Sequence, residues 1–131
     1  MSWTYSIAPH TLTGESQSYS VGLYSGAFGV WQNNPAYIAE ANKGPIPPGN
    51  WIATELIEDD PVTGEYTIVL KPADNATLEA AFMLGRAPYS FRIHGDDIAS
   101  PGHGSDGCIV APRDVREAFW NSPDHALRVT A

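Results

Sequence analysis

The sequence contains a single cysteine, Cys108, which follows a glycine at the end of a polar segment. Because Gly107 has no Cβ, the chain can turn tightly there and point backbone N–H groups outward beside the sulfur, where they can hold an oxyanion. His94 stands fourteen residues earlier, and a loop that folds back would bring its imidazole to the thiol. An adjacent imidazole lowers the pKa of a thiol and supplies a base. This pair therefore predicts acyl transfer through a thioester.

Other roles fit the same residues. A lone cysteine in a soluble domain is often a small buried apolar side chain, a histidine at a strand end is often only hydrogen-bonded, and glycines often only form turns. Zinc binding is a further alternative, and its ligands would be His94, Asp96, His103 and Cys108. The spacing of these residues matches no common metal-binding pattern, however, and only one thiolate is present. We therefore expect neither a metal nor another cofactor.

The clearest element that would position the pair is a strand over Tyr89–His94, in which apolar and polar residues alternate. Because successive side chains of a strand point to opposite faces, this alternation predicts one apolar face. His94 then lies on the polar face, at the end of the strand. Beyond Cys108, Pro112 is placed to open a helix, in which three apolar residues recur at i, i+3 and i+4.

The rest of the chain also favours strands, because β-branched and aromatic runs are separated by turn residues. The expected strands are Trp3–Ile7, Ser18–Tyr24, Trp51–Glu58, Glu65–Lys71 and Leu127–Thr130. Residues 13–15 would join the first two strands, residues 26–49 would be mostly loop, and residues 77–84 would form one or two helical turns. We therefore predict a mainly β fold with one or two short helices, in a single domain over residues 1–131.

Composition excludes several kinds of partner. With a net charge of −8, nothing would offset repulsion from the phosphates of a nucleic acid. No apolar run approaches the length of a membrane span, and one cysteine allows no internal disulfide. The first ten residues hold no Lys or Arg and no apolar core of signal-peptide length. We therefore expect synthesis in the cytoplasm without a signal peptide.

His94-Gly95, followed by Ser105-Asp106-Gly107-Cys108, resembles the active-site signature of L,D-transpeptidases, in which a His-Gly strand end precedes a Ser/Thr-X-Gly-Cys turn. Over nearly its whole length the chain is also similar to the small L,D-transpeptidase-like effectors of bacterial type VI secretion. The matching segments are Ser2–Tyr5, Tyr24–Gly26, Asn33–Pro35, Gly44–Pro47, Gly85–Arg86, Phe91–Asp96, Gly107–Ile109 and Pro112–Arg116. Lys43–Ile52 also resembles the Pro-X-Gly-aromatic segment that opens a strand in L,D-transpeptidases.

The resemblance implies roles for individual residues. Cys108 matches the nucleophile and His94 the base, and a carbonyl near Gly95 would orient the imidazole. Ser105 matches the position that shapes the turn. The candidates for the oxyanion hole are the amides of Asp106, Gly107 and Cys108. Asp106 also departs from the pattern, because many housekeeping members carry histidine there, and this departure bears on the choice of acceptor.

Four further side chains are candidates for contact with the substrate. Arg86 and Arg92 could hold carboxylates through bidentate hydrogen bonds or be ordinary surface charges. His103, between two glycines, could lie at the mouth of the site or only in a mobile loop. Tyr24 could line a groove, although aromatic residues in a small β domain are more often part of the core.

The resemblance also implies an activity. Such an enzyme acts on the tetrapeptide stems of peptidoglycan, at the bond before the terminal D-alanine. Hydrolysis of the thioester gives a tripeptide (L,D-carboxypeptidase), and a free D-amino acid gives an exchanged stem (L,D-transpeptidase). As a secreted effector, the protein would be an antibacterial toxin in the periplasm of a target bacterium, with a cognate immunity protein and a secretion-apparatus carrier as partners. The alternatives are a housekeeping cell-wall enzyme and a non-catalytic wall-binding or adaptor domain with an inert Cys108.

Overall fold

A computed structural model describes residues 3–131 of the chain. Met1 and Ser2, which belong to the predicted domain and to the first segment of the resemblance, lie outside the described residues. The strands are β1 Trp3–Ser6, β2 Thr11–Thr13, β3 Ser18–Tyr19, β4 Tyr24–Ser25, β5 Gly49–Asp60, β6 Gly64–Pro72, β7 Arg92–His94, β8 Ile109–Val110 and β9 Ala126–Thr130. The helices are a short 3-10 helix, η1 Pro35–Tyr37, and the α-helices α1 Asn75–Met83 and α2 Arg113–Trp120.

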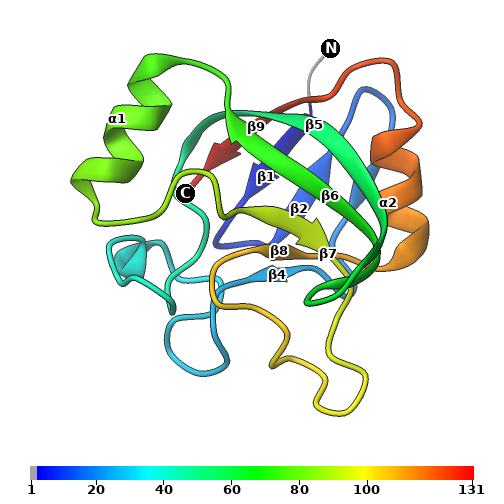
Figure 1. The fold of residues 1–131 in the computed structure, drawn as a ribbon, viewed down its shortest axis with the longest axis horizontal. Helices are drawn as coiled ribbons and strands as arrows, with labels where there is room; N and C mark the ends of the chain where they lie inside the picture. The colour runs from blue at the N-terminus through cyan, green and yellow to red at the C-terminus, as the bar shows by residue number, and fades with distance from the viewer. Residues whose placement is uncertain (1–2) are drawn as a thin grey trace.

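The nine strands form one mixed sheet in the order β3-β2-β1-β9-β5-β6-β7-β8-β4 (Figure 1). Two neighbouring pairs are parallel, β1 with β9 and β7 with β8, and the other pairs are antiparallel. The long β5–β6 hairpin crosses the middle of the molecule, and α1 and α2 lie at its two sides in Figure 1. The predicted mainly β fold with one or two short helices is confirmed, and the α-helices are two.

A continuous apolar core holds the sheet. Tyr5 and Trp51 from the strands and Phe119 from α2 are each 0% exposed. Phe119 meets the edge of the Trp3 ring at a centroid distance of 5.5 Å. The expected apolar face of α2 is confirmed, because Val115 and Phe119 are both buried. Full burial of each such side chain contributes roughly 1.5–3 kcal/mol, so this core gives the site a rigid support.

The prediction of a strand over Ser18–Tyr24 is wrong. Residues 11–13, of which only Thr13 is expected to lie in the connection between the first two strands, form β2, which pairs with both β1 and β3. The chain then leaves the sheet at Gly22, whose φ of +77° is a conformation that favours glycine. Residues 24–25 return as β4 at the opposite edge of the sheet, paired with β8. This crossing delivers β4 to the strand that follows Cys108.

The predicted hairpin over residues 51–71 is confirmed and is longer than expected, extending over Gly49–Asp60 and Gly64–Pro72. Its tip is closed by the Asp60 carboxylate, which accepts hydrogen bonds from the backbone N–H groups of Val62 (2.8 Å) and Thr63 (2.9 Å). The same hydrogen bonds, that of Thr63 above all, lower the pKa of Asp60. The tip is therefore a defined turn.

The predicted strand over Tyr89–His94 is shorter than expected, because only Arg92–His94 pair as β7. Tyr89 is 57% exposed, so the apolar face begins at Phe91. His94 does point away from Ile93 and the core, as the alternation predicts, but it is only 5% exposed. A side chain expected at the polar surface is thereby buried.

Candidate active site

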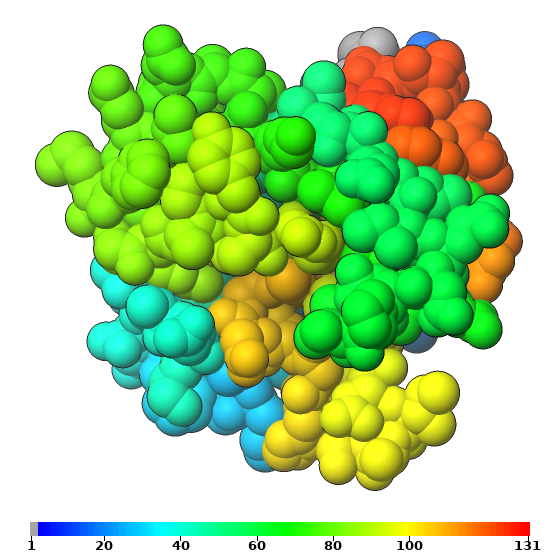
Figure 2. All heavy atoms as spheres, in the orientation of Figure 1, coloured from blue at the N-terminus to red at the C-terminus, as the bar shows by residue number. Residues whose placement is uncertain are grey.

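A cleft of about 950 Å³ is lined by both His94 and Cys108. Its walls come from five segments of the chain: the loop after η1 (41–42), the hairpin tip (62–64), the loop after α1 (85–91), the end of β7 with the loop that follows it (94–99) and the turn before β8 (103–108). In Figure 2 the orange turn lies in a hollow between the green hairpin tip, the yellow loop and the cyan loop. The segment singled out from the sequence thus lies on an open surface that a peptide can reach.

The register of β7 and β8 brings His94 and Cys108 to one face of the sheet. Ile93 pairs with Ile109 and His94 with Val110 in a parallel ladder. Continued by one residue, this register places Cys108 opposite Arg92 and diagonal to His94. From the strand spacing and rise, diagonal Cα atoms are roughly 8 Å apart, and long or aromatic side chains reach across such pairs.

The imidazole of His94 is held by its own chain. Its Nδ1 lies 2.7 Å from the carbonyl oxygen of Gly95, and because a carbonyl can only accept, Nδ1 carries the proton and donates it. The other ring nitrogen, Nε2, is then the basic atom. Burial lowers the pKa of His94, and the Arg116 charge lowers it further, against the opposing effects of the Gly95 carbonyl and of Asp60 and Asp96. The ring is therefore a neutral base near pH 7.

The thiol of Cys108 is half-buried and protonated. Its Sγ lies 3.7 Å from the carbonyl oxygen of Ser90, to which the S–H donates. Burial raises the pKa of Cys108 and Asp106 raises it further, whereas the backbone N–H and charge of Arg92 and the charge of Arg86 lower it. Among residues 3–131 no hydrogen bond joins this thiol to His94. The expectation that the imidazole lowers the thiol pKa is thus wrong for this arrangement, because desolvation dominates.

Ser105 organises the turn before Cys108, in the position that the resemblance gives it. Its hydroxyl oxygen accepts hydrogen bonds from the backbone N–H groups of Gly26 (3.1 Å) and Gly107 (3.0 Å). The hydroxyl donates in turn to the Cys108 carbonyl at 2.6 Å. Because the Gly107 N–H is bound to Ser105, the amides of Asp106 and Cys108 remain as candidates for the oxyanion hole.

Gly107 lies where no side chain fits. Its φ is +144°, and a Cβ there would come within 2.5 Å of Arg86 Nη2 and 3.1 Å of the Gly44 carbonyl oxygen. We expect Gly107→Ala to lower the free energy of unfolding by about 1–2 kcal/mol from backbone strain and by a further ~1–3 kcal/mol from overpacking. Chemical denaturation measures the total.

Gly85→Ala is the matched control for this substitution. Gly85 also has a positive φ, +75°, but a Cβ there would meet nothing within 4 Å. This variant therefore isolates the backbone strain. Equal losses of stability in the two variants would contradict the close packing of Gly107 against Arg86.

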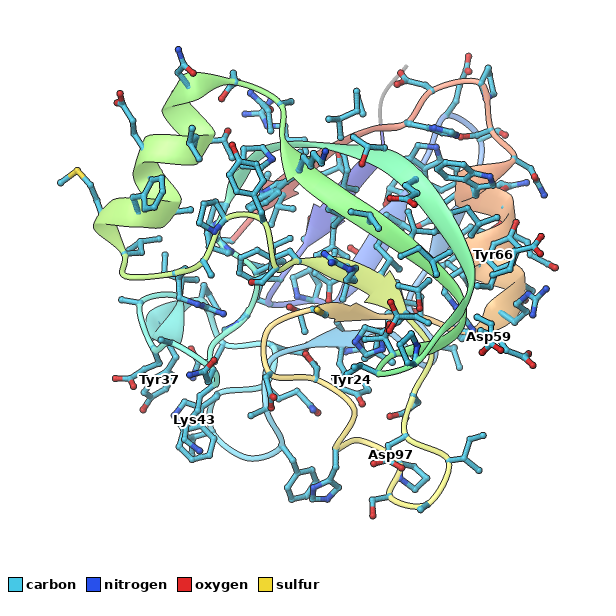
Figure 3. All side chains as sticks on the ribbon, viewed as in Figure 1. Tyr24, Tyr37, Lys43, Asp59, Tyr66 and Asp97 are labelled. Carbon is cyan, nitrogen blue, oxygen red and sulfur yellow. The ribbon has the colours of Figure 1, made fainter. Side chains whose placement is uncertain are left out.

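Tyr24 anchors the loop that follows β7 and borders the cleft. Tyr24 itself is not among the residues that line the cleft. Its hydroxyl donates to the Asp96 carboxylate and accepts from the Gly104 N–H at 2.9 Å. Burial, with Asp96 next, raises the pKa of Tyr24 well above its ordinary value. Figure 3 shows Tyr24 at the inner end of the loop and Asp97 farther out on it. The structure thus gives Tyr24 a place beneath the loop, which differs from the predicted contact with substrate.

The other three predicted substrate contacts lie in different surroundings. Arg86 is 5% exposed and donates only to backbone carbonyls. Arg92 is half-buried and reaches back to the carbonyls of Tyr89 (3.4 Å) and Phe91 (3.2 Å), outside the cleft lining. His103 is exposed, lines the cleft and stacks on Phe28 at a centroid distance of 4.1 Å. Of the four candidates, His103 alone is both at the cleft and open to a ligand.

Arg116 is a neighbour of the site to which the sequence pattern assigned no role. It is 7% exposed, and its guanidinium donates to the carbonyls of Ala111 (3.0 Å), Glu65 (2.7 Å) and Tyr66 (2.9 Å). It joins α2 to the hairpin and lies behind Gly95, where a Cβ would be 3.0 Å from Nη2. An arginine on a short helix ordinarily faces solvent, so no signal in the sequence pointed to this contact.

The four side chains of the zinc alternative do not assemble. Among residues 3–131, no group of three or more His, Cys, Asp and Glu side chains is arranged to hold a metal ion. Within the same residues, neither α-helix is long and apolar enough to cross a bilayer.

No protein-family model and no curated protein sequence matches the chain. A solved L,D-transpeptidase from Mycobacterium smegmatis does have a similar structure, with a TM-score of 0.52 and 14% sequence identity. The alignment covers 98% of this chain and 58% of that one, so the chain spans little more than half the length of the enzyme. The protein therefore has an L,D-transpeptidase-like fold over almost its whole described length.

Proposed function

We propose that the protein is a cysteine enzyme of L,D-transpeptidase type, which cleaves peptidoglycan tetrapeptide stems through a thioester on Cys108. The observation that carries this proposal is the placement of His94 at the end of β7 and of Cys108 directly before the parallel strand β8, both lining one cleft. The fixed tautomer of His94, with Nδ1 committed to the Gly95 carbonyl, supports it further. The fold of a known L,D-transpeptidase agrees with this chemistry.

In the proposed reaction, substrate binding displaces the thiol from the Ser90 carbonyl, and His94 Nε2 takes its proton. Sγ then bonds to the carbonyl carbon before the terminal D-alanine, and the amides of Asp106 and Cys108 hold the oxyanion. His94 returns the proton to the departing D-alanine nitrogen as the peptide bond breaks. Water or an amine next attacks the thioester, releases the stem and regenerates the thiol.

Purified muropeptides test the proposal directly. Incubation with the protein should convert tetrapeptides to tripeptides with release of D-alanine, and an added D-amino acid should appear as an exchanged stem, both detected by mass spectrometry. The stem thioester should be trapped on Cys108 by acid quenching. Tetrapeptides that remain intact at micromolar enzyme, with no acyl adduct on the protein, would refute the activity.

We further propose that the protein acts as an antibacterial effector in the periplasm of a rival cell, paired with an immunity protein and delivered by a secretion carrier. The ordered sequence resemblance over nearly the whole chain supports this role. Production fused to an export signal in a Gram-negative host should lyse cells, while the same protein kept in the cytoplasm should not. Equal toxicity in both compartments, or none in the periplasm, would count against an effector that attacks the wall.

A further inference from the structure

Arg86 carries a buried positive charge directly after α1. Its side chain donates to three backbone carbonyls of one loop: Nη1 to Ile38 (2.8 Å) and Pro45 (2.8 Å), and Nη2 to Gly44 (2.9 Å). The guanidinium also lies over the Phe91 ring, with Cζ 5.3 Å from the ring centroid. These contacts tie the loop after η1 to the floor of the cleft.

The charge of Arg86 has no countercharge. Within residues 3–131, no Asp or Glu carboxylate lies within ion-pair distance of its guanidinium, and the described ion pairs belong to Arg113. Burial of an ion costs several kcal/mol, which is why the pKa of Arg86 is lowered. Neutral donors could bind the same three carbonyls, so these hydrogen bonds do not by themselves require a charged side chain at this place.

The turn that carries the nucleophile lies directly on this guanidinium. A Cβ at Gly107 would be 2.5 Å from Arg86 Nη2, so the backbone before Cys108 packs against the charged group. The Gly107 carbonyl accepts from Ser25 Oγ at 2.8 Å, and Ser25 Oγ accepts from the Ile46 N–H at 3.0 Å. Arg86 and Ser25 thus hold the turn against the residue 44–46 segment.

We propose that Arg86 is a positioning residue for the nucleophile: its guanidinium fixes the Gly107–Cys108 backbone, and its unneutralised charge stabilises the anionic sulfur as it forms. This inference rests on the proposed function only in taking Cys108 as the nucleophile. The inference also accounts for a buried arginine beside a thiol that is neutral at rest, because the thiolate that would neutralise the arginine forms only during the reaction.

The elements packed around Cys108 bring four charged or titratable groups near its sulfur. They are Arg92 on β7, Asp106 in the turn, Arg86 after α1 and His94 across the cleft. Asp106 is exposed and Arg92 is half-exposed, so solvent and salt screen both of them. Arg86 is buried, so its interaction with the sulfur is screened less. The charge of Arg92 lowers the thiol pKa more than that of Arg86 does, but salt screens it, so we expect Arg86 to be the cation whose effect on the thiolate persists at high ionic strength.

The rate of alkylation of Cys108 by iodoacetamide, followed against pH, tests the inference without any substrate. Loss of a positive charge disfavours the thiolate and raises the thiol pKa, so Arg86→Gln should react about tenfold more slowly at pH 7 than the wild type. Arg86→Lys keeps the charge and should stay within a few-fold of the wild type. Arg116→Gln is the matched control, because Arg116 is equally buried on three carbonyls but contacts Gly95 rather than Gly107.

Equal alkylation profiles for Arg86→Gln and the wild type, or an equal slowing in Arg116→Gln, would overturn the inference and leave Arg86 a purely structural residue. If the Arg86 variants do not fold, NMR of the wild type decides. The Arg86 guanidinium resonances should then titrate with the midpoint of the Cys108 alkylation profile, and Cys108→Ser should abolish that titration. Absence of this step would overturn the inference. If tetrapeptides stay intact while the alkylation profile of Arg86→Gln is shifted, the proposed activity is refuted and the inference about Arg86 stands.

Discussion

Replacing Cys108 by serine should lower the release of D-alanine from tetrapeptides by at least about 10⁴-fold, because loss of a nucleophile removes the covalent pathway. Serine has nearly the same shape, but its hydroxyl is a far weaker acid than a thiol. The base opposite it is weak as well, because burial lowers the pKa of His94. This imidazole can take a proton from sulfur as substrate binds but not from a serine hydroxyl.

The measurement is the rate of tripeptide formation by mass spectrometry, accompanied by thermal unfolding. We expect little change in stability, since the hydrogen bond that the thiol donates, to the Ser90 carbonyl at 3.7 Å, is weak. Cys108→Ala provides the second variant, because it removes the thiol without adding a hydroxyl. Unchanged activity in either variant would show that the chemistry does not pass through this sulfur.

His94→Gln should slow the same reaction by about 10²–10⁴-fold, the contribution of a positioned general base. Glutamine keeps a polar side chain of similar length but has no basic nitrogen, so the substitution removes the basic Nε2 atom. His125→Gln is the control. His125 stacks on Trp120 with ring centroids 4.3 Å apart and is not among the residues that line the cleft, so its substitution should leave the rate within a few-fold of the wild type.

The pH dependence distinguishes a base from a merely structural histidine. The neutral imidazole is the active form, so protonation lowers the rate as the pH falls. Because the pKa of His94 lies below the ordinary value of 6.5, wild-type kcat/KM should hold at pH 6.5 and fall only at lower pH. The His94→Gln variant should lack this acidic limb. A wild-type limb centred above 6.5, or the same limb in the variant, would mean that another group is titrating.

Local patterns in the sequence were sufficient for the elements whose partners are close along the chain. Alternation and turn residues identified the β5–β6 hairpin, and helical spacing after Pro112 identified α2. Local patterns failed at Ser18–Tyr24. The chain turns at Gly22, and Tyr24 pairs with Val110, which is far away in the sequence. Pairing across such distances leaves no periodic trace.

The types and order of residues in the chain by themselves identified the candidate pair, since few side chains other than a thiol and an imidazole offer a nucleophile and a base near neutral pH. Tertiary structure alone decided their state. The parallel register of β7 and β8 sets the diagonal placement, and burial leaves the thiol protonated and the imidazole neutral. The tertiary structure also turns Arg86 inward, away from the solvent where arginine is usually found. Desolvation depends on everything that surrounds a group in space, and a linear pattern does not contain that information.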